Sequence, residues 1–225
     1  YDLPKEVMAK LTSAWARPLR ETEVALTHSH RTAWQRVVAA KRPALILEDD
    51  AVLCESLPQI LSELALKTDL QFVQLETFKV PKLIDKNLKS LTAWPYQIGR
   101  LYRDRGGAAA YFLWPDAAKK LVNSVQINYP PADAAIHLAQ NIRRHQVVPA
   151  CAIQAMHIVS GSADFDRVVD IVPSTVTTTP KPSYGSFIQW LRYKSRRAVI
   201  SFTILQRKMV SRRLAEYRLV EFTGE

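Results

Sequence analysis

Three consecutive carboxylates, Glu48-Asp49-Asp50, form the most chemically informative segment of the 225-residue sequence. They directly follow the apolar run 44–47, which predicts a buried strand of the parallel type. Ligands bind at the carboxyl ends of strands in open α/β sheets, so a site is expected here. Packed carboxylates repel unless a cation compensates them, and their oxygens are ligands for Mg²⁺ or Mn²⁺ that can bridge to a diphosphate. The alternative is a solvated acidic turn that caps the next helix.

Helices and strands are expected to alternate around these acids. Apolar spacing predicts helices over 20–41, 56–66 and 131–142, and a further helix that begins at Pro115. Strands are expected over 44–47, 70–75 and 146–154, and directly after Gly106-Gly107. The order strand, helix, strand around the acids is typical of a βαβ unit. The predicted fold class is therefore an α/β sandwich.

The positive charge is concentrated in the last part of the chain. From Lys181 onward there are ten basic and three acidic residues, which account for seven of the net charge of +10. Residues 173–185 are rich in Pro, Thr and Ser and predict a linker, whereas 186–225 predict a basic amphipathic helical tail. This tail either packs on the body with its basic face in water, or binds an anionic membrane surface through Phe187, Trp190 and Phe202. No nucleic-acid-binding signature accompanies the charge, so no nucleic-acid partner is expected.

The composition excludes several classes of protein. With 48% hydrophobic and 23% charged residues, the sequence is neither disordered nor fibrous. It contains no apolar window long enough for a membrane-spanning helix and no visible secretory signal. Its two cysteines form no disulfide framework, which predicts a reducing, cytoplasmic location.

The acids belong to a longer ordered pattern that resembles glycosyltransferase family 25. Ser29-His30 precedes Trp34, and LILEDD begins eleven residues after that tryptophan. Further blocks follow in the family's order, namely VQLETF over 73–78, Gly107 with Ala110 and Tyr111, Pro131 with Asp133, and Pro149 with Gln154. The resemblance covers roughly residues 20–160. The family contains bacterial lipopolysaccharide β-galactosyltransferases and collagen galactosyltransferases.

The resemblance implies a GT-A-like nucleotide-sugar-binding sandwich, with residues 1–172 as the catalytic domain. It implies an inverting hexosyltransferase that uses Mn²⁺ or Mg²⁺ and a UDP-sugar donor, most often UDP-galactose. The implied acceptor is a glycolipid or oligosaccharide of lipopolysaccharide or a related surface glycan. The expected location is cytoplasmic, peripheral on the inner face of the cytoplasmic membrane.

Individual residues take roles from the same resemblance. Asp50 is the leading metal ligand and Glu48 the second, and Asp133 is the candidate general base or acceptor-binding residue, with a plain helix N-cap as its alternative. The donor-binding candidates are Ser29, His30, Glu48, Asp49, Gly106 and Gly107. For His30 the alternative is a packed, hydrogen-bonded core residue, and for the glycine pair it is a simple turn. Trp34 and Tyr111 are expected in the core.

One departure from the family keeps other functions open. Family members open with a strand of the type VINL and an arginine-containing loop, and nothing before Glu21 replaces that element convincingly. This favours, as the alternative function, a non-enzymatic peripheral membrane or partner-binding protein on a degenerate transferase fold. A carboxylate-metal phosphohydrolase or nuclease is a third reading, but the ordered blocks argue against it.

Overall fold

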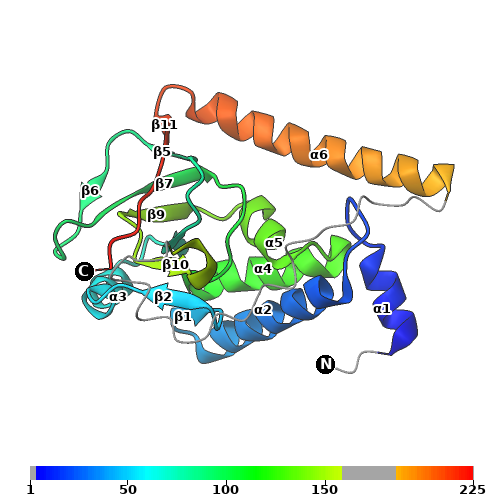
Figure 1. The fold of residues 1–225 in the computed structure, drawn as a ribbon, viewed down its shortest axis with the longest axis horizontal. Helices are drawn as coiled ribbons and strands as arrows, with labels where there is room; N and C mark the ends of the chain where they lie inside the picture. Colours follow the sequence, from blue (N-terminus) through cyan, green and yellow to red (C-terminus); the bar gives the residue numbers. More distant parts are fainter. Residues whose placement is uncertain (1–3, 159–185, 225) are drawn as a thin grey trace.

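The computed structural model describes residues 4–158 and 186–224 as a mixed α/β fold with a multistranded sheet (Figure 1). The helices are α1 (Lys5–Thr12), α2 (Glu21–Ala40), α3 (Leu57–Ala65), α4 (Pro115–Asn128), α5 (Ala132–Leu138), a 3₁₀ turn (Ala155–His157) and α6 (Phe187–Ser211). The strands are β1 (Ala44–Leu47), β2 (Ala51–Leu53), β3 (Phe72–Gln74), β4 (Glu76–Thr77), β5 (Lys82–Asp85), β6 (Lys89–Ser90), β7 (Gln97–Arg103), β8 (Ala110–Leu113), β9 (Arg144–Val148), β10 (Ala152–Gln154) and β11 (Ala215–Arg218).

Two sheets carry these strands. The main sheet has the order β1-β8-β3-β9-β7-β5-β11, with β6 paired to β7, and the smaller sheet has the order β2-β10-β4. β1 and β3 are both antiparallel to β8, and β9 is parallel to β3. The carboxyl ends of β1, β3 and β9 therefore lie at the same edge of the main sheet. This edge positions the candidate site.

The expected βαβ unit with a parallel strand at 44–47 is wrong. β1 and β3 point the same way but are not hydrogen-bonded neighbours, because β8 lies between them and pairs antiparallel with both. The apolar run that ends in acids indicated a strand, but it could not indicate which strand would pair with it. The consequence for the site is small, since the two strand ends still meet at one edge.

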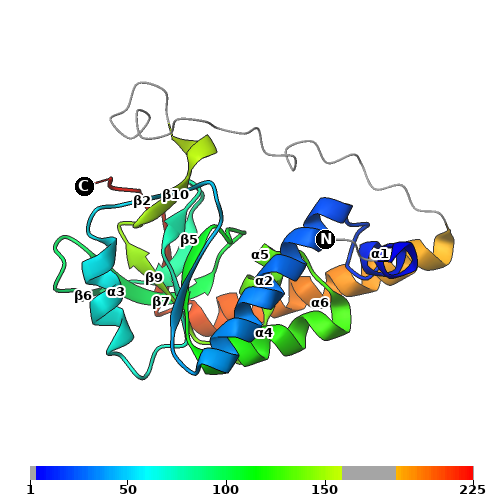
Figure 2. The same ribbon diagram turned by 90° about the horizontal axis from the view of Figure 1, so that it is seen from below.

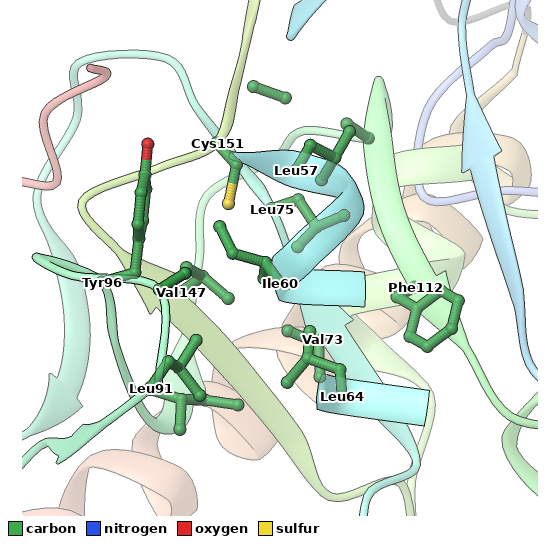
Figure 3. Packing of buried hydrophobic residues seen from close by; sticks show 14 of the residues in the cluster. Leu57, Ile60, Leu64, Val73, Leu75, Leu91, Tyr96, Phe112, Val147 and Cys151 are labelled. Carbon is green, nitrogen blue, oxygen red and sulfur yellow. The ribbon is translucent and has the colours of Figure 1, made fainter. Parts of the chain in front are cut away.

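Helices cover both faces of the main sheet. Trp34 of α2 and Leu121 of α4 pack with Phe72, Tyr111 and other sheet residues on one face. On the opposite face, α3 contributes Leu57, Ile60 and Leu64 to a cluster with the strand residues Val73, Leu75, Phe112 and Val147 (Figure 3). Alternate residues of β3 and β8 thus face opposite layers, as the pleat of a strand requires. Figure 2 shows α2, α4 and α6 on the same side of the molecule, with α3 across the sheet from them.

The C-terminal part of the chain combines a helix and a strand. α6 begins after Ser186, whose side chain accepts a hydrogen bond from the amide of Gln189, and ends at Ser211. The chain then forms β11, which pairs antiparallel with β5, so the helical part of the tail is shorter than the expected 186–225. The predicted linker 173–185 lies outside the described residues. Within the described ranges, no helix combines the length and hydropathy needed to cross a membrane.

Candidate active site

Two glutamates stand at the shared edge of the main sheet, one after β1 and one after β3. Glu48 directly follows β1, and its amide donates to the carbonyl of Ala109 at 2.8 Å. Glu76 follows β3 by two residues and is the first residue of β4. The segment that leads into β8 lies between them, because β8 separates β1 from β3. The charge of Glu48 raises the pKa of Glu76, after the larger effect of burial, so the two carboxylates lie within electrostatic range of each other.

His30 links α2 to the first of these glutamates. Its Nε2 lies 3.0 Å from Oε1 of Glu48, and its Nδ1 lies 2.8 Å from the hydroxyl of Tyr111. Trp34 Nε1 donates to the same hydroxyl at 2.7 Å. The hydroxyl can therefore donate its own proton to Nδ1, which leaves Nε2 to donate to Glu48. His30 is therefore the packed, hydrogen-bonded core residue of its alternative, and it also orients the acidic loop, whereas donor binding by His30 stays a prediction.

Trp34 and Tyr111 are core residues, as expected, and are fully buried. Both side chains pack against His30, and the rings of His30 and Tyr111 are stacked with 5.8 Å between their centroids. Burial raises the pKa of Tyr111 well above its ordinary value, and the charges of Glu48 and Glu76 add to this shift. The tyrosine is thus a neutral hydrogen-bonding group beneath the two glutamates.

Asp50 is held by the smaller sheet. Its carbonyl accepts from the amide of Ala155 at 2.9 Å, and its Oδ2 accepts from Nε2 of Gln154 at 3.3 Å. Its Oδ1 is buried and has no hydrogen-bond partner among the described residues. Burial raises the pKa of Asp50, and the charges of Glu48 and Asp49 raise it further. A cation near Asp50 would offset this accumulation of negative charge.

The acidic run does not cap the following helix, so this part of its alternative interpretation is wrong. β2 follows the acids directly, and α3 begins only at Leu57 with Ser56 as its N-cap. The acids instead connect a strand of the main sheet to a strand of the smaller one, which places Asp50 over the same edge as Glu48.

Glu76 is a fully buried acid at this edge. Its Oε1 accepts from the amide of Ala109 at 2.8 Å and from Nε2 of Gln74 at 2.9 Å. Its Oε2 is buried without a hydrogen-bond partner in the described part of the chain. Burial raises the pKa of Glu76 to about 8, opposed by the charge of Lys82. At neutral pH this side chain is therefore mostly protonated, and Oε2 can donate a hydrogen bond.

The glycine pair lies against two carboxylates. Gly107 has a φ of +98°, and a Cβ there would lie 2.7 Å from Oε1 of Glu76. A Cβ on Gly106 would lie 3.3 Å from Oδ2 of Asp133. Nε2 of His137 donates to the carbonyl of Gly107 at 2.9 Å and so fixes the loop to α5. Gly107 therefore allows the backbone to pass this close to Glu76, which a residue with a Cβ would not, whereas approach of the glycine pair to a donor stays a prediction.

Asp133 is not the helix N-cap that was its alternative reading. Pro131 is the N-cap of α5, and Asp133 is the second residue of the helix. Its Oδ1 accepts from the amide of Ala134 at 2.6 Å. The side chain is partly exposed, and its charge contributes to raising the pKa of Arg17 after the larger effect of the Arg17–Glu23 hydrogen bonds. Asp133 thus lies beside the glycine pair, at the margin of the carboxylate cluster formed by Glu48, Asp50 and Glu76.

A buried ion pair contacts the backbone of Glu76. Nζ of Lys82 lies 2.7 Å from Oδ2 of Asp104, and both side chains are buried. The same ammonium donates to the carbonyl of Glu76 and to Oε1 of Gln146, both at 2.8 Å. These contacts join the backbone of Glu76 to β5 and β9 of the main sheet.

The structure does not bring every predicted residue into the cluster. Asp49 and Ser29 are exposed, and the hydrogen bonds that join His30, Glu48 and Tyr111 include neither of them. Glu76 and Lys82 were not predicted as site residues. For Glu76 a signal existed, because it follows an apolar strand just as Glu48 does, whereas no local pattern distinguishes Lys82 from a surface lysine.

Across the described residues, no group of three His, Cys, Asp or Glu side chains could by itself hold a metal ion. Comparison with known families gives a match to the model of glycosyltransferase family 25, described as lipopolysaccharide biosynthesis protein, over residues 2–136. This range includes Glu48, Asp50, Glu76 and Asp133. A search of curated proteins gives no match.

Proposed function

Because the chain belongs to glycosyltransferase family 25, we propose that the carboxylate cluster is the donor site of a hexosyltransferase. The proposed reaction moves a hexose, galactose in the first instance, from a UDP-sugar to a hydroxyl of lipopolysaccharide or a related surface glycan. The fold is then of the GT-A-like type. The observation that carries the proposal is the set of three acids held at one sheet edge, two of which have a buried oxygen without a partner among the described residues.

We also propose a divalent cation, Mn²⁺ or Mg²⁺, at this site. Mg²⁺ is often bound by one or two carboxylates together with substrate phosphates, so a complete protein cage is not required. Oδ1 of Asp50 has no hydrogen-bond partner within the described ranges, and burial raises the pKa of its carboxyl. Both features support Asp50 as the first ligand, with Glu48 as the second. When bound with the donor, the ion would neutralise charge on the departing diphosphate.

The residues around the acids have positioning tasks in this proposal. The bond from His30 to Glu48 orients that carboxylate, and the buried Tyr111 fixes the histidine in turn. The absence of a Cβ at Gly107 lets the segment before β8 lie directly against Glu76 and so helps to hold that side chain in place. With its proton in place, Glu76 can donate from Oε2 to an oxygen of the donor without adding a further negative charge.

Asp133 is the proposed base for the acceptor hydroxyl, in an inverting displacement. A general base must be ionised before the reaction and must have an oxygen available to the substrate. Glu76 meets this condition poorly, because burial raises its pKa to about 8. Asp133 is partly exposed, and only its Oδ1 is used by the amide of Ala134, so Oδ2 beside Gly106 is the oxygen that would take the proton.

The test is calorimetric titration of the chain with UDP-galactose and UDP-glucose, with and without Mn²⁺. We expect binding that requires the metal and that falls about tenfold or more in Asp50→Ala, because a lost charged ligand typically costs more than 1.4 kcal/mol. Glu6→Ala removes an exposed acid of α1 and is the matched control. Binding without metal would refute the cation, and equal binding by Asp50→Ala would move the site elsewhere. No binding by the intact chain would favour the non-enzymatic alternative.

A lipopolysaccharide acceptor also implies work at a membrane. We propose that the protein acts peripherally at the inner face of the cytoplasmic membrane, where a basic surface would keep it near a lipid-linked acceptor.

A further inference from the structure

α6 has one face that packs on the body and is fixed there by specific contacts. Tyr193 and Ser211 are buried on this face. Arg196 donates to the carbonyls of Ser13 and Trp15, and Arg207 donates to the carbonyls at the end of α5, namely those of His137, Leu138 and Ala139. These four helix residues set the rotation of α6 about its own axis.

The opposite face of α6 is apolar and exposed. At about 100° per residue, Leu191, Phe202 and Met209 point roughly 160 to 180° away from Tyr193. Phe187 and Leu205 lie next to them on the same face, and their exposed fractions are 73% and 53%. These five residues form the exposed apolar strip. Figure 1 shows α6 at the border of the described part of the molecule, with one long side directed away from the sheet. Water-exposed apolar side chains aligned along a whole helix indicate an interaction surface.

Cations lie on both sides of the exposed apolar strip. By the same helical geometry, Lys194, Arg197 and Lys208 lie on one flank and Arg192 on the other. Trp190 lies on the first flank, with its ring 5.6 Å from that of Phe187 and with Nζ of Lys194 5.4 Å above it. An apolar strip with basic flanks and an aromatic residue at its margin is typical of helices that lie in the plane of a membrane interface.

From this arrangement we infer that α6 docks flat on an anionic lipid surface through the exposed apolar strip, with its basic flanks against the headgroups. The inference concerns binding rather than catalysis and does not depend on the proposed reaction. α6 would lie parallel to the membrane plane for about 37 Å, the length of a 25-residue helix.

The charge of α6 selects lipid over a second copy of the chain as the occupant. The helix contains six basic residues and no acidic one. Two copies packed strip to strip would bring the four flanking cations of each helix together with no acid on either helix to compensate them. An anionic leaflet supplies the missing countercharge, and its acyl region accepts the strip.

The docked helix also reaches the candidate site, a point that does rest on the proposed function. Arg207 caps the end of α5, and Asp133 lies in the first turn of that same helix. α5 therefore spans from the membrane-bound helix to the proposed base. Docking would hold Asp133 at a fixed height above the lipid surface, where a lipid-linked acceptor hydroxyl can reach it.

The experiment is co-sedimentation of the full chain with vesicles of phosphatidylcholine, with and without phosphatidylglycerol. We expect binding only to the anionic vesicles, with loss of binding at high salt. The triple variant Phe202→Ser/Leu205→Ser/Met209→Ser should bind about tenfold more weakly or worse, because three apolar side chains no longer enter the interface. The double variant Lys194→Glu/Arg197→Glu should lose binding as well.

The control changes exposed apolar residues elsewhere. Leu66 and Trp94 are 82% and 88% exposed, so Leu66→Ser/Trp94→Ser should bind vesicles like the wild type. Equal binding by the strip variant and the wild type, or no binding by either, would overturn the inference. A lipid-independent dimer that the strip variant abolishes, seen by sedimentation velocity, would show that a second copy is the occupant instead. UDP-sugar titration of the strip variant in solution separates this result from a failure of the donor site, because the strip lies on the face of α6 opposite the one that contacts α5.

Discussion

The surroundings of Glu76 and the helix α6 both depart from the usual placement of side chains. The first region buries charged groups, and the second exposes apolar ones. The cluster buries Glu76 together with the pair Lys82 and Asp104, although charged residues are almost never fully buried unless paired. α6 exposes a continuous apolar strip, although such surface is ordinarily covered. Burying charge is unfavourable in the first region, and exposing apolar surface to water is unfavourable in the second. Such departures occur at functional sites, where binding of a ligand offsets the unfavourable free energy. The buried charges fit a polar ligand, and the exposed apolar strip fits a lipid.

The strongest test of this contrast is Lys82→Met. The substitution leaves Asp104 buried without its cation and removes the donor to the carbonyl of Glu76. We expect the free energy of unfolding to fall by about 3–5 kcal/mol, as for other buried pairs that lose one partner. Urea denaturation followed by circular dichroism measures this change. Lys89→Met, at an exposed lysine of β6, should have little effect, and equal losses in the two variants would show that the ion pair is not the cause.

The pH dependence of stability tests the protonated state of Glu76. Burial raises the pKa of Glu76 to about 8, against 4.5 for an ordinary glutamate. Between these values the folded state keeps a proton that the unfolded state has released, so the contribution of Glu76 to stability falls as pH rises. Relative to Glu76→Gln, the wild type should lose up to about 5 kcal/mol of the free energy of unfolding across this range.

A second buried group, His145, changes the free energy of unfolding with pH in the opposite direction. Its effect must be separated from that of Glu76. Burial lowers the pKa of His145 to about 4, so its contribution to stability rises as pH increases from about 4 to 6.5. Wild type and Glu76→Gln share His145, and the difference between their urea midpoints cancels its effect. A difference that stays constant with pH would mean that Glu76 is ionised in the folded protein.

The smallest effect is expected in α6. Phe202→Ser/Leu205→Ser/Met209→Ser changes only exposed side chains, each worth about 0.5 kcal/mol at most, so the free energy of unfolding without lipid should fall by no more than about 1.5 kcal/mol. Thermal unfolding of the variant beside the wild type measures this. A large loss would show that the strip is covered by the protein itself, and the contrast between the two regions would then fail.

Local patterns in the sequence predicted most elements of the body. The strand at 44–47 and the long helix that ends before Pro43 follow from apolar runs and stop signals, and the structure has both. Glu48 and His30 were found because each is close in sequence to such an element. Their mutual contact could not be deduced, since it depends on how α2 packs against the sheet.

Other features depend on contacts between distant parts of the chain. The insertion of β8 between β1 and β3 gives both strands an antiparallel neighbour, although the two strands still point the same way. Residues 215–218 were expected to be helical because they continue a basic tail, yet they form β11. Lys82 looks like a surface lysine until Asp104 and Gln146 are placed around it. Pairings of this kind leave no trace in local composition.

The pairing of β11 with β5 also bears on how the protein folds. Ala215 lies opposite Asp85, and Ala150 forms a bridge with Phe222, so strands distant along the chain close the sheet together. Such long-range closure is slow, because the entropy of a large loop is lost before the new contacts form. Until β11 is in place, β5 presents an open edge that another polypeptide can join. β11 then becomes the edge strand of the main sheet, where its charged residues Glu216 and Arg218 disfavour pairing with another polypeptide.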